Sequence, residues 1–79
     1  MSARILFFGF TADIAGKREI EILVPDALSA NSVLNDVLGR IPSLAGHNLH
    51  ISINQQYATG NEIIRDGDEL AIFTAVSGG

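Results

Sequence analysis

The chain has 79 residues, which is enough for one small domain with a compact core. Its 47% hydrophobic and 18% charged residues exclude an intrinsically disordered chain, and the absence of cysteine excludes disulfides, thiolate metal sites and a thiol nucleophile. The net charge of −4, with five scattered basic residues, argues against a nucleic-acid partner. Since no apolar stretch is long enough to cross a membrane, we expect a cytoplasmic protein without a membrane partner.

The chain begins with two expected strands. Residues 3–10 are nearly all apolar, which predicts a strand in the middle of a sheet or one with a face reserved for a partner. Residues 11–18 connect it onward, with Thr11 or Asp13 as candidate caps of a single helical turn. Residues 19–24 alternate between apolar and polar side chains, which predicts a second strand, antiparallel to the first, with one solvent-exposed face.

One amphipathic helix is expected over residues 29–41. Its apolar residues recur at helical spacing and form one stripe: Val33, Leu34, Val37, Leu38 and Ile41. Ser29 is the expected N-cap, and Pro42 disfavours continuation of the helix. An isolated helix of about a dozen residues is marginal in water, so packing on a sheet has to stabilise it.

The second half of the chain alternates turns with short apolar runs. Residues 42–48 are expected to form a loop, and residues 49–54 a third strand that buries every second side chain. Asp66-Gly67 is a strong turn signal, because such turns need a residue with positive φ. The remaining expected elements are a turn at 54–56, an edge segment at 57–58, a core plug at Ile63-Ile64 and a last strand at 69–73.

The order of these elements predicts the fold. One amphipathic helix can cover one face of one sheet, which gives a two-layer domain. The first and last strands are the most apolar, so we place them side by side at the centre of the sheet. We therefore expect an α+β fold of the β-grasp, or ubiquitin-like, type, in which a mixed sheet of four or five strands packs on one main helix. It forms a single domain over residues 1–79.

The sequence offers little for catalysis within the domain. His47 lies in an expected loop and His50 on the polar face of an expected strand, and neither has a partner set in sequence. The acidic turn at residues 66–69 lacks the spaced oxygen ligands of a calcium loop. Gly9 and Gly16 form no phosphate-binding pattern. We therefore expect no bound cofactor and no metal.

Three phenylalanines are candidates for a partner-binding surface. Strand alternation places Phe8 on the face opposite Phe7, and Phe73 on the face opposite Ile72. If Phe7 and Ile72 face the helix, then Phe8, Phe10 and Phe73 gather on the other side near the C-terminal tail. An exposed patch of this kind is typical of a docking surface. The alternative is that these side chains close a second, minor core under the loops.

Residues 74–79 read Thr-Ala-Val-Ser-Gly-Gly, and we expect them to form a flexible tail. Glycine has no Cβ, so Gly78 and Gly79 can thread a slot that any side chain would block. The tail places the α-carboxylate of Gly79 at the tip of an arm that reaches about 20 Å. We expect this carboxylate to be the reactive group and Val76 and Ser77 to contact the partner. A frayed terminus is the alternative.

Several motifs together resemble the MoaD family, the small subunits of molybdopterin synthase within the ubiquitin-like sulfur carriers. They span nearly the whole chain: Ile5-Leu6-Phe7-Phe8-Gly9, Ile14-Ala15-Gly16, Ile53-Asn54-Gln55, Asp66-Gly67-Asp68-Glu69 and Val76-Ser77-Gly78-Gly79. The thiamine-pathway carrier ThiS shares the two turns and the diglycine, but it usually has a shorter first hairpin than residues 11–18 provide.

The resemblance implies a carrier that acts with partner enzymes. An adenylating activating enzyme would consume ATP to activate the Gly79 carboxylate, and a sulfur donor protein would convert the acyl-adenylate to a thiocarboxylate. The tail would then deliver sulfur to a pterin precursor held by the molybdopterin synthase large subunit, in an expected heterotetramer. Phe8 and Phe73 match apolar positions that family members use against their partners.

The chain departs from the family pattern near the tail. Thr74-Ala75 stand where the family often has two prolines, and Ala12 stands where it tends to have a basic residue. A tail root without prolines loses more conformational entropy when it becomes ordered in a partner. Two other interpretations therefore stay open: a carrier for thiamine or another pathway, and a β-grasp interaction module with an inert tail.

Overall fold

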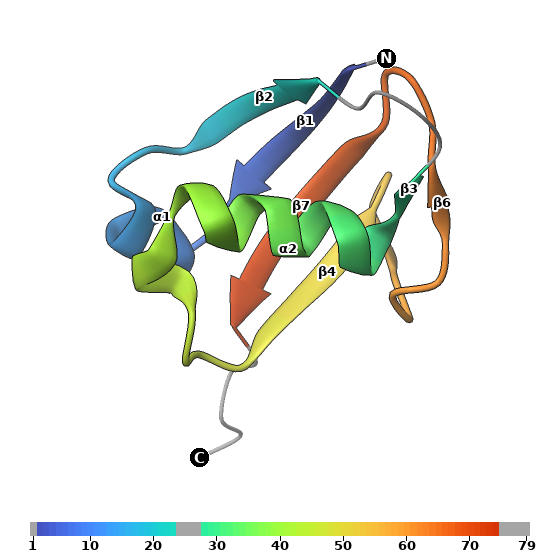
Figure 1. Cartoon of the computed structure of the whole chain (residues 1–79). Coiled ribbons are helices and arrows are strands. Elements are labelled where there is room, and N and C mark those ends of the chain that lie inside the picture. Colours follow the sequence, from blue (N-terminus) through green and yellow to red (C-terminus); the bar gives the residue numbers. More distant parts are fainter. Residues whose placement is uncertain (1, 24–27, 75–79) are drawn as a thin grey trace.

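The computed structural model describes residues 2–23 and 28–74, which form a two-layer α+β domain (Figure 1). Its main sheet has the strand order β2-β1-β7-β4-β5. β1 runs parallel to β7, and the other neighbouring strands are antiparallel. The strands are β1 (Ser2–Phe7), β2 (Glu19–Leu23), β4 (Leu49–Ile53), β5 (Gln56–Tyr57) and β7 (Glu69–Thr74). The predicted pairing of the first and last strands is confirmed, and β7 extends to the first residue of the expected tail.

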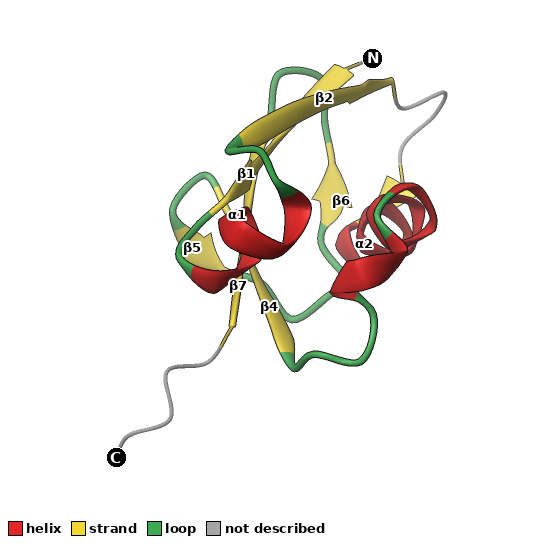
Figure 2. Ribbon diagram, turned by 90° about the vertical axis from the view of Figure 1, so that its left-hand side faces the viewer, coloured by secondary structure: helices red, strands yellow, loops and turns green. Residues whose placement is uncertain are grey.

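The main helix, α2 (Ala30–Arg40), crosses one face of the sheet diagonally (Figures 1 and 2). Ser29 is its N-cap, as predicted, and its hydroxyl oxygen accepts a hydrogen bond from the backbone N–H of Ser32. The backbone N–H of Ala30 donates to the carbonyl oxygen of Glu62 at 2.8 Å. These bonds satisfy N–H groups in the first turn that have no partner within the helix.

The hydrophobic core fills the space between α2 and the sheet. Its largest fully buried apolar side chains are Ile5, Val33, Val37, Leu44, Ile64, Leu70 and Ile72. Leu44 belongs to a short 3-10 helix, η1 (Pro42–Leu44), within a segment that the sequence predicted as loop only. Burial of a leucine side chain stabilises a fold by about 1.5–3 kcal/mol, which explains why this connection is pinned to the core.

A second, two-stranded sheet lies beside the main one. Antiparallel β3 (Leu28–Ser29) and β6 (Ile63–Ile64) form it. Ile64 is buried, as predicted, but Ile63 is 51% exposed. The predicted plug therefore consists of Ile64 alone, because successive side chains of a strand point to opposite faces.

The first strand ends three residues earlier than predicted, because the chain turns at Gly9. This residue has φ +58, in the left-handed region that glycine adopts readily. Phe10 therefore begins a short helix, α1 (Phe10–Ala15), in place of continuing the strand. Gly9 is the N-cap of α1 and no side chain caps the helix, so the prediction that Thr11 or Asp13 caps it is wrong. Thr11 is buried inside the helix.

Polar side chains hold together the end of the sheet where β7 begins. The predicted Asp66-Gly67 turn is present, with φ +83 at Gly67. The side-chain amide of Asn54 donates to a carboxylate oxygen of Asp68 at 3.1 Å, and its oxygen accepts the backbone N–H of Glu69 at 3.1 Å. The hairpin turn between β4 and β5 is thus bound to the turn before β7. We call this region the turn end of the sheet; it comprises residues 2–4, 54 and 65–69.

Candidate partner-binding face

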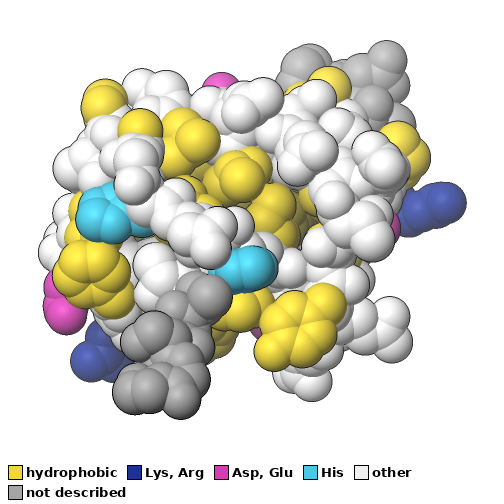
Figure 3. Space-filling view, turned by 90° about the horizontal axis from the view of Figure 1, so that it is seen from below, with side chains coloured by type: hydrophobic (Ala, Val, Ile, Leu, Met, Phe, Trp, Pro, Cys, Tyr) yellow, Lys and Arg dark blue, Asp and Glu magenta, His cyan; other side chains and the backbone are white. Residues whose placement is uncertain are grey.

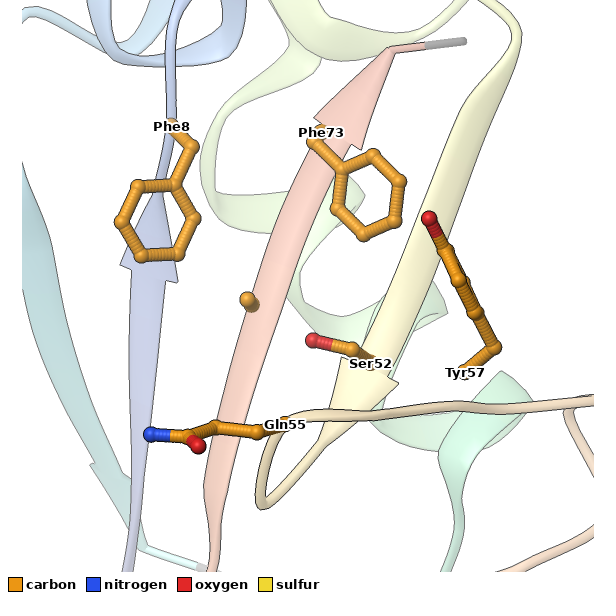
Figure 4. A pocket seen from close by; sticks show the side chains of 6 residues that line it. Phe8, Ser52, Gln55, Tyr57 and Phe73 are labelled. Carbon is orange, nitrogen blue, oxygen red and sulfur yellow. The ribbon is translucent and has the colours of Figure 1, made fainter.

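The sheet face opposite α2 carries an open pocket beside the last residues of β7. Its volume is about 250 Å³. Aromatic and small side chains line it, and Figure 4 shows them around the hollow: Phe8, Ser52, Gln55, Tyr57, Ala71 and Phe73. We call this set the aromatic pocket. Phe8 is 53% exposed and Tyr57 is 83% exposed, so large apolar surfaces here face water, as is typical of a docking site.

Strand alternation puts Phe8 and Phe73 on this face, as predicted. Phe7 and Ile72 are both buried under α2, so the residue after each of them points to the opposite side. The two strands are direct neighbours in the sheet, with Phe7 opposite Ile72. Phe8 and Phe73 therefore form adjacent walls of one pocket (Figure 4).

Phe73 is the centre of a cluster of rings from neighbouring strands. Its register partner across β4 is His50, and the two rings stack with centroids 5.8 Å apart and planes 22° apart. Tyr57 contacts Phe73 edge to face, also with centroids 5.8 Å apart. Aromatic pairs of this kind contribute about 0.5–1.5 kcal/mol beyond area burial. The wall of the pocket is therefore ordered before any partner arrives.

Gln55 closes the pocket at the side nearer the turn end. Its side chain reaches from the turn between β4 and β5 across β7 toward β1 (Figure 4). Gln55 has φ 71, a conformation that non-glycine residues other than Asn, Asp and His rarely adopt. Left-handed backbone costs such a residue about 1–2 kcal/mol. A residue held at this cost beside an exposed pocket is a candidate for a functional role.

Phe10 lies apart from the aromatic pocket, which corrects the predicted grouping of three phenylalanines. It is 52% exposed, and its ring meets His47 edge to face with centroids 5.3 Å apart. The prediction extended strand alternation through Phe10, but this residue belongs to a helix, where alternation no longer holds. Phe10 and His47 form a separate aromatic pair. A partner-binding role for Phe10 stays a prediction.

The two ends of the sheet differ in surface chemistry: charged side chains pair near one end, and hydrophobic side chains are exposed at the other. Near the turn end, the guanidinium of Arg4 lies 2.7 Å from a carboxylate oxygen of Glu69 and 3.9 Å from one of Glu19. The opposite end, viewed in Figure 3, displays hydrophobic side chains with both histidines among them and charged side chains at the margin. We call it the tail end; it comprises residues 8–11, 47–50, 73 and 74.

Sequence reasoning missed four side chains around Phe73: His50, Ser52, Gln55 and Tyr57. A signal for two of them was present, because burial of Ile51 places both its neighbours on the open face. Tyr57 depends on the hairpin register, which sets it opposite Ser52. That β4 lies beside β7 follows from contacts between segments distant in sequence, and no local pattern contains it.

The remaining predicted residues lie outside the part of the chain that the structure describes. They are Val76, Ser77, Gly78 and Gly79. Within the described residues, no group of three or more acidic, histidine or cysteine side chains is placed to hold a metal ion. None of the described helices has the length and apolar character needed to cross a membrane.

Comparison with known proteins identifies the family. The chain matches the ThiS family over residues 5–79. It is 30% identical over 80 residues to the human molybdopterin synthase sulfur carrier subunit, covering 95% of this chain and 91% of the relative. The protein of the same name from Chlamydomonas reinhardtii is 28% identical over 83 residues, with both chains fully covered.

Solved structures agree with this match. SAMP1 from Haloferax volcanii superposes with a TM-score of 0.89 at 27% identity, over the whole of both chains. A complex of subunits 1 and 2 of the molybdopterin-converting factor from Helicobacter pylori contains a chain with a TM-score of 0.71 at 22% identity, again over both whole chains, which shows a common fold. The chain is therefore a β-grasp protein that belongs to the ThiS family, together with relatives named molybdopterin synthase sulfur carrier subunits.

Proposed function

We propose that this chain is the sulfur carrier subunit of a molybdopterin synthase. The observation that carries the proposal is the position of the aromatic pocket. Phe73 forms one of its walls and directly precedes residues 74–79, the expected tail. A partner docked on the pocket therefore lies within about 20 Å of the Gly79 carboxylate, the reach of an extended arm of six residues. Family membership through residue 79 supports the same reading.

The chemistry belongs to the tail and to its partners. In the activating enzyme, a carboxylate oxygen of Gly79 attacks the α-phosphorus of ATP and pyrophosphate leaves, which gives an acyl-adenylate. The terminal sulfur of a persulfide on a donor protein then attacks the acyl carbon, and AMP leaves. A thiol cleaves the resulting acyl disulfide, which releases the thiocarboxylate and leaves a disulfide on the donor side. After the sulfur attacks a pterin precursor, hydrolysis of the acyl–sulfur bond by water returns the carboxylate. Gly78 lets this end pass through a narrow channel, because it has no side chain.

We propose that the molybdopterin synthase large subunit docks on the aromatic pocket, in a heterotetramer. The Helicobacter pylori relative in fold is a complex of the factor's subunits 1 and 2. Half-exposed aromatic side chains such as Phe8 are frequent binding hot spots, and a net charge of −4 favours encounter with a basic partner surface. The absence of cysteine is compatible with the reducing cytoplasm, which we propose as the location.

Intact-mass measurement tests the proposal. The full-length chain is incubated with a family activating enzyme, ATP and a sulfur donor. We expect its mass to rise by the difference between one sulfur and one oxygen atom, and we expect a chain without Gly79 to show no such gain. A full-length chain that keeps its mass with every activating enzyme of the family would overturn the proposal.

A carrier for another pathway is the second candidate, and the specific observation behind it is the family model, which is that of ThiS. Capture of the endogenous partner separates the two carriers, because the scaffold is common to both and the docking surface is not. The third interpretation, an interaction module with an inert tail, requires that removal of Gly78 and Gly79 leave function unchanged. We expect function to be lost.

A further inference from the structure

Thr11 is a buried polar residue that the docking surface leaves unexplained. Its exposed fraction is 0%, and among the described residues it is the only polar side chain in the buried set. Its hydroxyl oxygen lies 2.8 Å from the carbonyl oxygen of Phe8 and 2.8 Å from that of Ile72. Burial of a hydroxyl is unfavourable unless it is hydrogen-bonded, and here two acceptors share its one proton.

These two acceptors belong to a residue that lines the aromatic pocket and to a neighbour of one. Phe8 itself forms one wall, and Ile72 precedes Phe73, which forms the other. Thr11 thus contacts the backbone of β7 and of Phe8, the residue that directly follows β1. It belongs to α1, so its hydroxyl connects this short helix to the last residues of β7.

Near the end of β7, the pairing with β1 stops earlier than the pairing with β4. Its register with β1 stops at Ile72, where the backbone N–H of Phe8 donates to the Ile72 carbonyl oxygen at 3.2 Å. Its register with β4 continues to Thr74, opposite Leu49. The last two residues of β7 are therefore paired on one side only. On the other side, where the pairing with β1 ends, the hydroxyl of Thr11 donates to the carbonyl oxygen of Ile72.

We propose that Thr11 is a positioning residue for the sulfur transfer, a role that rests on the proposed function. Its hydroxyl holds the end of β7 against α1 and so restrains the direction in which the chain leaves the sheet. The pocket does not depend on this bond, because each carbonyl oxygen also accepts a backbone N–H. The N–H of Thr11 donates to the carbonyl oxygen of Phe8, and the N–H of Phe8 donates to that of Ile72. Thr11 therefore affects the reaction of the tail more than the docking of the partner.

The test compares two substitutions in the full-length, thiocarboxylated chain. Thr11→Val keeps the shape and removes the hydroxyl, while Thr11→Ser keeps the hydroxyl. We expect the sulfur-transfer rate at saturating large subunit to fall by roughly three- to tenfold in Thr11→Val, the equivalent of one net hydrogen bond. We expect the dissociation constant to change by less than about twofold on the same argument, and Thr11→Ser to recover most of the rate.

A matched control separates positioning from stability. Val37 is also fully buried, but it lies on α2, away from the end of β7. Val37→Ala lowers the melting temperature and should leave the transfer rate unchanged at temperatures well below it. Amide hydrogen exchange at Phe73, which pairs with His50 of β4 near the end of β7, gives a second readout. We expect exchange there to become faster in Thr11→Val and to stay unchanged in Val37→Ala.

The outcomes distinguish this inference from the proposed function. A wild-type chain that cannot be thiocarboxylated overturns the function and the role in transfer together, while the exchange data still decide whether Thr11 holds the end of β7. If the wild type is thiocarboxylated and Thr11→Val transfers sulfur as fast as the wild type, or is slowed no more than Val37→Ala, the inference about Thr11 alone is overturned.

Discussion

The two ends of the central sheet are built from different chemistry. At the turn end, short polar side chains bind one another and the backbone: Asp66 accepts the N–H of Ser2 at 2.7 Å, and Asp68 accepts the N–H of Arg65 at 2.7 Å. At the tail end, hydrophobic side chains and both histidines are at the surface (Figure 3). Phe8 and Phe10 are each more than half exposed.

This difference shows how one small domain separates stability from recognition. Polar groups that are satisfied within the chain gain little from a partner, whereas apolar area removed from water contributes about 25 cal/mol per Å². The turn end therefore stabilises the fold by itself. The tail end keeps exposed apolar area that a partner can bury, next to the last described residue of the chain.

The largest expected effect comes from the aromatic pocket, and two phenylalanines of equal exposure provide a matched pair. Phe8→Ala removes a wall of the pocket, and we expect a loss of partner affinity of roughly 30-fold, or about 2 kcal/mol. Phe10→Ala removes a ring of the same exposure outside the pocket and should cost much less. Calorimetric titration of the large subunit measures both. Equal losses would mean that the whole tail end, and not the pocket, forms the interface.

At the turn end, Asn54→Ala removes two hydrogen bonds, to Asp68 and Glu69. We expect the free energy of unfolding in urea to fall by about 1–2 kcal/mol, with partner affinity unchanged. Asn54 has φ 48, so Asn54→Gly should be less damaging than Asn54→Ala, because glycine adopts positive φ without strain. Weaker partner binding by either variant would break the separation between the two ends.

Gln55 lies between the two ends, so its substitution tests whether stability and partner binding are separate there. Its φ of 71 is strained for glutamine, and its side chain lines the pocket. Gln55→Gly should therefore raise the free energy of unfolding by up to about 1 kcal/mol and at the same time weaken partner binding severalfold. Urea unfolding and calorimetry on one sample measure the two changes. A variant that gains stability and keeps its affinity would show that Gln55 has no part in recognition.

The smallest expected effect is a pH dependence at Glu62. The backbone N–H of Thr59 donates to its carboxylate at 2.8 Å, and this hydrogen bond, with others from the same turn, lowers the pKa of Glu62 below the ordinary glutamate value. Because the folded pKa is lowered, the stabilisation is present above the ordinary glutamate pKa of about 4.3 and is lost as the pH falls through the lowered value.

In Glu62→Gln, the free energy of unfolding should therefore depend less on pH in the acid range than in the wild type. Near neutral pH, it should not change with pH. Urea unfolding at a series of pH values measures this. If the variant and the wild type have parallel profiles down to acid pH, the carboxylate contributes nothing to the polar turn at 59–62.

Much of the fold could be predicted because its signals are local. Periods of two and of 3.6 residues located the strands and the helix, Ser29 marked the start of α2, and Asp66-Gly67 marked the turn before β7. The errors occur where a single backbone conformation overrides such a pattern. Gly9 ends β1 and moves Phe10 into α1, although the apolar run continues through it.

The candidate site was predictable only in part, for the same physical reason. The positions of Phe8 and Phe73 followed from the alternation of side chains along the first and last expected strands. The diglycine could be read directly from the sequence. The sequence by itself thus determined the β-grasp elements and the membership of a carrier family, while the role of the tail stays a prediction.

Only the tertiary structure decided which side chains meet. It brought His50 and Tyr57 to Phe73, separated Phe10 from the pocket and placed the hydroxyl of Thr11 against the Ile72 carbonyl. These contacts join segments that are far apart in the chain. They depend on strand order and register, which arise when the whole core packs and no short stretch of residues encodes them.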